Sequence, residues 1–174
     1  MARLTAVECR EFIKVVVDKA NEMHVPISVS VVNAEGHLIA LERMDDAGFI
    51  TAEICWSKAF TVAAFRSMSP RFPDGLVIHK WFMERNPQMM MNAAVFTGGK
   101  VAASGGSAPI FCGNEMVGAY AISGATSGQD EEIAEFARRK AGWEKAPTDD
   151  NTSDTVKQHI NEIYAKVGLG ERKL

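Results

Sequence analysis

The sequence predicts an α/β (α+β) fold in which helices flank an antiparallel sheet. Helical periodicity and strand-like alternation both occur along the chain. Apolar segments between about residues 94 and 123 are joined by connections too short for the crossovers that parallel strands require. The 174 residues, 47% of them apolar, suffice for one sizeable core. We therefore expect one domain over residues 1–143.

The N-terminal part predicts a helix followed by two strands. Thr5 and Glu8 have the spacing of a capping box, and apolar residues then repeat at helical intervals, so we expect a helix over 5–23. Valine and serine alternate over 27–31, which predicts a half-buried strand, and the return strand is expected over 37–43.

The middle of the chain predicts a buried helix and the rest of the sheet. The segment 51–67 is apolar on almost every side, as in a helix between a sheet and a neighbouring element. Prolines and a glycine interrupt the next segment, and the mixed composition of 77–92 leaves it unassigned, with a short helix as one alternative. Further strands are expected at about 94–96, 100–104, 108–112 and 115–123.

Two more helices are expected at the C-terminal end. Ser127 and Asp130 open the first, whose acidic start and basic end match the helix dipole before Gly142. A polar linker follows, and apolar residues at helical spacing predict a last helix that ends at Gly168. The extension 144–174 would then pack its amphipathic helix on its own domain or on a neighbouring subunit.

Composition argues against several kinds of partner. The net charge of −3 leaves no basic surface for nucleic acid or for an anionic membrane. Three widely separated cysteines fit reduced thiols better than a disulfide framework. The N-terminus lacks the apolar run of a secretory signal, and no stretch of about 18 apolar residues occurs. These observations predict a cytoplasmic protein.

Lys58 is the first candidate for a functional residue. It lies on the same stripe of the expected central helix as Val62 and Phe65, where an ammonium group would lose water unless another group pairs with it. A carboxylate anchor and an acid/base group are both consistent with this position, as is a lysine bonded to strand carbonyls. Glu53, in the first turn of the same helix, is a second candidate proton carrier.

A glycine-rich loop before the last hairpin is the main candidate for ligand binding. Ser104, Gly105, Gly106 and Ser107 precede the strand that contains Pro109, and bared amides there are suited to hold an anion. The same residues would also serve an ordinary tight turn. Arg43, at the end of the second strand, has a guanidinium that matches a carboxylate, although a surface ion pair with Glu53 is an alternative.

The segment 77–92 contributes aromatic and metal-ligating side chains. Trp81 and Phe82 are candidates for stacking on a flat ligand, although buried aromatic residues usually only pack. No metal site is expected, and His79 and Glu84 are the only local pair worth inspecting. Axial ligation of haem by His79 or by a methionine of 89–91 is a further alternative to a pliable core.

Several motifs, in order, resemble one known family. They are Val31 to Ala40 around the Asn33-Ala34-Glu35-Gly36 turn, Glu42 to Asp45, Lys58 to Thr61, Gly105 to Pro109, and Gly118 to Gly124 followed by Gln129-Asp130-Glu131. Over about residues 4–141 the chain resembles the GlcG/HbpS family, which is also found as the C-terminal domain of PduO and is often described as haem-degrading. Here the chain has Asn33 where typical members have aspartate, and a shorter glycine run.

The resemblance implies a three-layer α/β/α, profilin-like arrangement with a five-stranded antiparallel sheet flanked by helices. It also implies assembly into homo-oligomers and a pocket for a small molecule, with haem, a corrinoid or a small organic acid as ligand. Both a haem cofactor and no cofactor remain open.

Two functions follow as hypotheses. The first is a protein that binds a small anionic ligand, haem or another tetrapyrrole or an organic acid, between the Gly105–Gly106 loop, the central helix and Lys58. In the second, a cofactor-independent catabolic lyase or isomerase acts on a small organic or aromatic acid, with Lys58 or Glu53 moving a proton.

Overall fold

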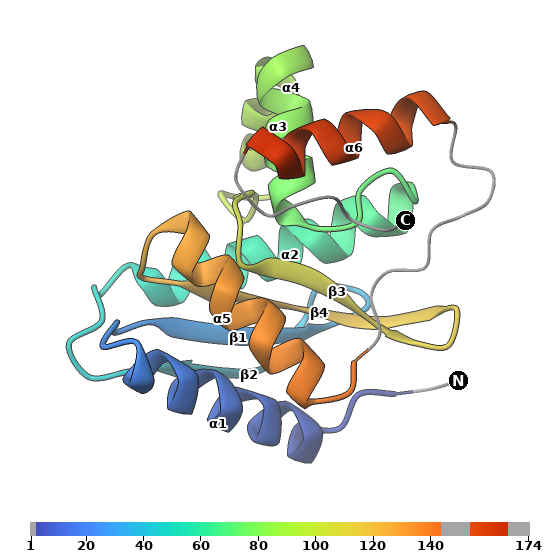
Figure 1. Ribbon diagram of the computed structural model, residues 1–174. Coiled ribbons are helices and arrows are strands. Elements are labelled where there is room, and N and C mark those ends of the chain that lie inside the picture. The colour runs from blue at the N-terminus through green and yellow to red at the C-terminus, as the bar shows by residue number, and fades with distance from the viewer. Residues whose placement is uncertain (1–2, 144–153, 167–174) are drawn as a thin grey trace.

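A computed structural model describes residues 3–143 and 154–166 (Figure 1). Their fold is α+β, with helices packed on an antiparallel sheet. In chain order the elements are α1 (Ala6–Glu22), β1 (Ser28–Asn33), β2 (Leu38–Arg43), α2 (Thr51–Met68), α3 (Gly75–Arg85), α4 (Pro87–Phe96), β3 (Ser107–Cys112), β4 (Glu115–Ser123), α5 (Ser127–Lys140) and α6 (Asp154–Lys166).

The sheet of the described residues has four strands in the order β2-β1-β4-β3, and every neighbouring pair is antiparallel. The antiparallel arrangement is as predicted, but the expectation of five strands is wrong. β1 and β4 are the two central strands, and their register pairs Ser28 with Ser123 and Val31 with Tyr120. The two hairpins therefore meet along strands that are far apart in the sequence.

The strands expected at 94–96 and 100–104 do not form. Residues 94–96 belong to α4, which ends at Phe96 where Gly98 and Gly99 take positive φ angles of 65° and 87°. The amide of Gly99 donates to the carbonyl of Ala94 at 2.7 Å and so closes the last turn of the helix. Val95 and Phe96 belong to residue types with high β-strand propensity, but the hydrogen bonds at the end of α4 hold them in a helix.

Helices cover both faces of the sheet (Figure 1). α1 and α5 pack together on one face, where Phe12, Val16 and Ile133 meet the inward side chains of β1 and β4. α2 crosses the other face, where Val62 packs with Ala119. Strand residues alternate between these two cores, as the period of two for a strand requires. Both sides of the central strands are thereby buried. The expectation of a half-buried strand over 27–31 is wrong, because Ser28 and Ser30 of β1 are 0% exposed: α2 covers the face that would otherwise meet solvent.

The remaining helices stand beyond α2. α3 packs on α2, and α4 packs on α3 and projects away from the sheet (Figure 1). Ile160, Ile163 and Tyr164 of α6 are buried together with Leu76 and Val77 of α3. The boundary predicted at 143 stays a prediction, and Gly168, the expected end of the last helix, lies outside the described residues.

Local capping signals explain where two helices begin. Thr5 caps α1 and forms a capping box with Glu8, as predicted. α5 is capped one residue earlier than predicted, by Thr126 in a capping box with Gln129. Asp130, which was expected to complete the cap, does not do so, and its carboxylate contacts Lys58 of α2 instead.

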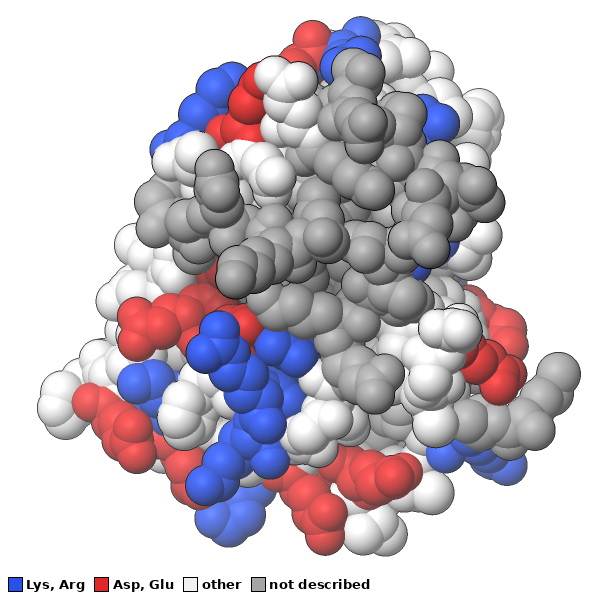
Figure 2. Space-filling model, turned by 45° about the vertical axis from the view of Figure 1, so that its right-hand side comes forward, with Lys and Arg blue, Asp and Glu red and all other residues white. Residues whose placement is uncertain are grey.

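In the described part of the chain, no helix combines the length and the apolar character that a bilayer-spanning segment needs. On the face shown in Figure 2, basic side chains form one group near the lower centre, and acidic side chains lie on both sides of it.

Candidate functional site

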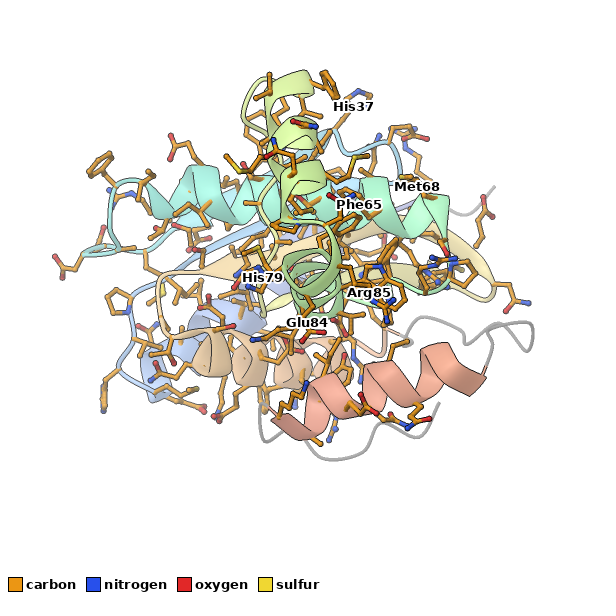
Figure 3. The ribbon with its side chains drawn as sticks, turned by 90° about the horizontal axis from the view of Figure 1, so that it is seen from above. His37, Phe65, Met68, His79, Glu84 and Arg85 are labelled. Carbon is orange, nitrogen blue, oxygen red and sulfur yellow. The ribbon has the colours of Figure 1, made fainter. Side chains whose placement is uncertain are left out.

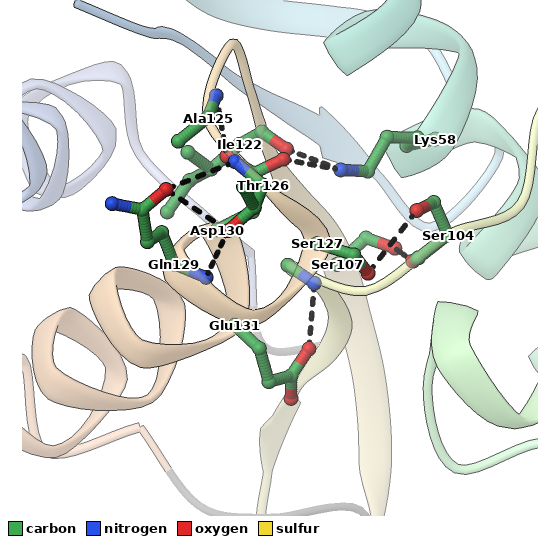
Figure 4. Close-up of polar contacts among 11 residues, drawn as sticks. Lys58, Ser104, Ser107, Ile122, Ala125, Thr126, Ser127, Gln129, Asp130 and Glu131 are labelled. Atoms are coloured by element: carbon green, nitrogen blue, oxygen red, sulfur yellow. Dashed lines mark hydrogen bonds and ion pairs between the residues drawn. The ribbon is translucent and has the colours of Figure 1, made fainter. Parts of the chain in front are cut away.

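Lys58 of α2 reaches through the core to the start of α5 (Figure 4). Its side chain is 2% exposed, and its Nζ lies 3.2 Å from Oδ2 of Asp130, whose side chain is 5% exposed. Nζ also donates a hydrogen bond to the carbonyl of Ile122 at the end of β4. The other oxygen of Asp130 accepts from the amide of Ala125 at 3.3 Å. The buried ammonium thus has an anionic partner and a strand carbonyl.

Burial shifts the pKa values of both partners toward their neutral forms. Loss of water lowers the pKa of Lys58, and the nearby Asp130 only partly offsets this. Loss of water likewise raises the pKa of Asp130 against the opposing effect of Lys58. The proton between these two groups is therefore less firmly held on the lysine than in water, a property that acid/base residues share.

The diglycine loop lies beside this ion pair. The amide of Gly106 donates to Oε2 of Glu131 at 2.6 Å, and the carbonyl of Gly106 accepts from the amide of Ile122 at 2.8 Å. A Cβ on Gly106 would lie 2.5 Å from Cβ of Asp130, and φ at Gly106 is +78°. Glycine is required here because the loop presses against α5 in a left-handed conformation.

The serines on either side of the glycines bond within the protein. The hydroxyl of Ser107 donates to the carbonyl of Ser104 at 3.0 Å, and the hydroxyl of Ser104 lies 3.5 Å from that of Ser127 (Figure 4). Pro109, also in the candidate set, is buried within β3. The expected anion-binding amide is thus occupied by the protein's own carboxylate.

The segment that leads into this loop is held by two helices. The amide of Ala102 donates to the hydroxyl of Thr61 in α2 at 2.9 Å. The start of α3 touches the loop so closely that a Cβ on Gly75 would clash with the hydroxyl of Ser107. These contacts replace the strand pairing expected for 100–104.

Arg43 and Glu53 are exposed, in contrast to the buried pair of Lys58 and Asp130. The guanidinium of Arg43 donates to the carbonyl of Ala47, and its side chain is exposed at the end of β2. Glu53 is exposed in the first turn of α2. Among the described residues, no ion pair joins Arg43 to Glu53.

Trp81 and Phe82 belong to an aromatic cluster between α2 and α3. Phe82 stacks on Phe72 at 5.6 Å between ring centroids, and Phe72 meets Trp81 edge-on at 6.1 Å. Two exposed arginines flank the indole: the guanidinium carbon of Arg85 lies 4.3 Å from its centroid, and that of Arg71 lies 5.6 Å from it. We call Arg71, Trp81, Phe82 and Arg85 the Trp81 surface; Phe72 is buried.

The candidate metal-ligating residues do not converge. His79 and Glu84 are five residues apart on α3, about 140° around the helix, and in Figure 3 they point to different sides. The carboxylate of Glu84 lies 3.9 Å from Nζ of Lys166, and the ring of His79 hydrogen-bonds to the backbone of Ala103. Burial lowers the pKa of His79. No group of three or more metal-ligating side chains occurs among the residues that the structure describes.

The methionines of α4 are spread around the helix. Met89 is 41% and Met91 65% exposed, whereas Met90 packs against the core of α2. Met68, at the end of α2, is 71% exposed, and in Figure 3 it lies on the same side of α3 as Arg85, opposite His79.

Sequence reasoning did not name Asp130 and Glu131 as site residues; it used them as acidic residues that favour a helix start and as part of a motif that carries the family resemblance. The helical pattern of 127–140 nevertheless indicated that Asp130 is buried. Asp130 precedes Ile133, Ala134 and Ala137 by three, four and seven residues, so it shares their buried stripe. An acidic residue on such a stripe requires a buried partner, which is the argument that singled out Lys58.

Comparison with known proteins identifies relatives of the chain. The model of a family described as haem-degrading HbpS-like proteins matches residues 4–139. A 15.0 kDa protein encoded between dhaT and dhaS in Citrobacter freundii is 28% identical over 79% of this chain and 91% of its own length. The corrinoid adenosyltransferase PduO of Salmonella typhimurium is 27% identical over 75% of this chain but only 36% of its own length, so the chain corresponds to about a third of that enzyme.

Among solved structures, a PduOC–haem complex has a similar fold, with a TM-score of 0.69. The match covers 84% of this chain and all of that one, at 24% sequence identity.

Proposed function

Because the chain belongs to the HbpS-like family, we propose that it binds haem, or another flat tetrapyrrole that carries carboxylates. The observation that carries the proposal is the family match together with a shared fold in a protein whose crystal structure is a haem complex.

The Trp81 surface has the chemistry that such a ligand needs. Haem has a large apolar ring and two propionate groups. The half-buried rings of Trp81 and Phe82 provide apolar surface, and the exposed guanidiniums of Arg71 and Arg85, which lie over the indole, match carboxylates. Met68 is exposed and lies on the side of Arg85 in Figure 3, so its thioether would be available to ligate the iron of a haem bound there.

The cations expected to hold carboxylates have partners inside the protein. Lys58 is paired with Asp130, Arg43 donates to the carbonyl of Ala47, and the amide of Gly106 donates to Glu131. A ligand carboxylate at the diglycine loop would have to displace one of these groups. We therefore place the carboxylate contacts at Arg71 and Arg85, which are exposed and, among the described residues, have no carboxylate or backbone carbonyl to give up, although Nε of Arg71 also donates to the hydroxyl of Ser69 at 3.2 Å.

Titration with haemin tests the proposal. The wild-type protein should show a saturable change in the Soret absorbance, and its absence would refute haem binding. Removing both flanking cations in Arg71→Ala/Arg85→Ala should raise Kd by roughly 10-fold or more, which corresponds to about 1.4 kcal/mol. Arg10→Ala removes an exposed arginine of α1 and serves as the matched control. Unchanged haemin affinity in the double variant would show that haem binds at a site other than the Trp81 surface.

The buried ion pair favours a second candidate function. Lys58 and Asp130 share a proton in an environment that weakens the charged form of each, and Glu131 lies on the adjacent loop amide. This arrangement suits proton abstraction from, and return to, a small organic or aromatic acid, as in a cofactor-independent lyase or isomerase. A substrate would reach Lys58 only if the loop or α5 moved.

Proton exchange tests this enzyme hypothesis. The protein is incubated in D₂O with a panel of small organic and aromatic carboxylic acids, and deuterium incorporation is followed by NMR. The double variant Lys58→Met/Asp130→Leu removes both proton carriers while retaining side-chain volume, and should abolish exchange. Glu53→Gln tests the exposed carboxylate separately. Exchange that survives in the double variant would rule out the buried pair as the proton carrier.

A further inference from the structure

The last described helix, α6, packs on the start of α3 and makes its own small apolar cluster there (Figure 1). This cluster is separate from the two cores that lie on the sheet. Its members are all buried, and they are Leu76 and Val77 of α3 with Ile160, Ile163 and Tyr164 of α6. The position of the first turn of α3 therefore depends on α6 as well as on α2.

α3 in turn supports the segment that ends in the diglycine loop. A Cβ on Gly75, the first residue of α3, would clash with the hydroxyl of Ser107 and would lie 2.6 Å from the carbonyl oxygen of Ser104. Further along the same helix, the ring of His79 hydrogen-bonds to the backbone of Ala103. Helix α3 thus contacts residues 103–107 at two places, and its first turn leaves the loop no room to lift.

The diglycine loop lies on both partners of Lys58 (Figure 4). The carbonyl of Gly106 accepts from the amide of Ile122 at 2.8 Å, and a Cβ on Gly106 would lie 2.5 Å from Cβ of Asp130. The ammonium of Lys58 donates to the carbonyl of Ile122 and to the carboxylate of Asp130. The loop therefore helps to enclose an ammonium whose side chain is 2% exposed.

We propose that α6 is a releasable strap that controls access to Lys58. While α6 is docked, α3 holds the diglycine loop on Ile122 and Asp130; when α6 is released, the loop lifts and small molecules reach the amine. This inference concerns access alone, and it holds whether or not the pair transfers protons.

Two observations favour release of α6 before any other element. A helix held by a separate small cluster opens at a lower free energy than the strands of a buried sheet. The helix also lies outside residues 4–139, the part of the chain that matches the family model. Its release therefore takes away no part of the matched domain.

Reductive methylation of lysines tests the proposal. Formaldehyde and dimethylamine borane methylate an amine only where they reach it, and mass spectrometry of peptides reports each lysine separately. In the wild-type protein Lys58 should react roughly 100-fold more slowly than Lys14, whose side chain is 75% exposed. Ile163→Asp places a charge in the cluster between α3 and α6 and should release the strap. Lys58 should then react roughly 10-fold faster or more, with Lys14 unchanged.

The matched control introduces the same charge on the exposed side of α6. Gln158→Asp should leave Lys58 as slow as in the wild type. Ile163→Ala shortens the same buried side chain without adding a charge, and should accelerate Lys58 to a smaller extent.

Amide hydrogen exchange separates release of the strap from unfolding. In both Ile163 variants the amides of Gly106 and Ile122 should exchange faster, while those of β1 keep their protection. Unchanged labelling of Lys58 in both variants would overturn the proposal. So would faster labelling that occurs only together with loss of protection in β1, since the whole domain would then be opening. Wild-type Lys58 that reacts as fast as Lys14 would overturn it as well, because the loop would then not close the site.

Discussion

At the scale of single residues, the contact between Lys58 and Asp130 joins the second helix to the fifth through the core. A buried ion pair is expensive to form because both charges lose water, and it is still more costly to break when one charge is left without its partner. Substitution of one partner therefore tests whether this ion pair is formed in the folded protein.

Replacing Lys58 with methionine should destabilise the protein strongly. Lys58→Met keeps the unbranched side-chain shape but leaves the Asp130 carboxylate buried without its cation, for which we expect a loss of about 3–5 kcal/mol. Lys14→Met breaks the exposed pair with Asp18 and should cost less than about 1 kcal/mol. Urea unfolding measures both values. Equal, small losses would show that Asp130 is not held by Lys58.

Alanine substitutions at Gly106 and Gly98 distinguish the cost of a steric clash from the cost of a left-handed backbone conformation. Both have positive φ, but a Cβ on Gly106 would lie 2.5 Å from Asp130, whereas a Cβ on Gly98 would have nothing within 4 Å. Gly98→Ala should therefore cost only the left-handed strain of about 1–2 kcal/mol. Gly106→Ala should cost more, because α5 or the loop must also shift. Thermal unfolding compares the two variants, and similar losses would contradict the close packing.

At the scale of elements, α6 is attached to the domain through α3. Ile160 is 2% and Ile163 1% exposed, and both lie in the small cluster with Leu76 and Val77. This cluster is separate from the two cores on the sheet, so α6 should be able to open without unfolding of the sheet.

Truncation of Ile160 tests that separation. Ile160→Ala removes a buried side chain, a change that costs about 2–5 kcal/mol in a well-packed core. Amide hydrogen exchange should become faster in α6, while β1 and β4 keep their protection. Gln158→Ala changes an exposed residue of the same helix and should leave both rates unchanged. Faster exchange in the sheet of Ile160→Ala would show that α6 and the sheet unfold together.

At the scale of the whole molecule, the two cores on the sheet each bury one thiol. Cys9 of α1 and Cys55 of α2 are fully buried, whereas Cys112 at the end of β3 is exposed. Burial raises the pKa of Cys9 to about 11 and that of Cys55 to about 11. Both thiols therefore stay protonated in the folded state at pH values where an unfolded thiol ionises.

The protein should lose stability above about pH 9. In that range the unfolded chain releases the thiol protons and the folded chain retains them, so the unfolding free energy falls as pH rises toward 11. Urea midpoints at pH 8, 9 and 10 measure the slope. Cys9→Ala/Cys55→Ala should reduce it, and Cys112→Ala, which retains both buried thiols, is the control. An unaltered slope in the double variant would exclude the buried thiols as its cause.

Local patterns in the sequence determined much of this architecture. The Thr5 capping box, the alternation in the first strand and the apolar surface of 51–67 each depend on residues within a few positions of one another, and the elements they predict are present. Lys58 was found as a buried cation for the same reason, since its helical stripe is a local property.

Only the tertiary structure decided the remaining features. The partner of Lys58 lies 72 residues away, and the amide of Gly106 finds its acceptor 25 residues along the chain. Segment 94–104 resembled strands, but a helix closure and a bond from Ala102 to Thr61 prevent it from entering the sheet. The apolar residues of α4 likewise follow an ordinary helical pattern. Which side of α4 faces outward, with Val95 and Phe96 exposed, depends on how α3 is placed. Sequence periodicity shows which faces of a helix or strand are apolar, whereas the packing of elements that are distant in the sequence determines which of those faces becomes buried.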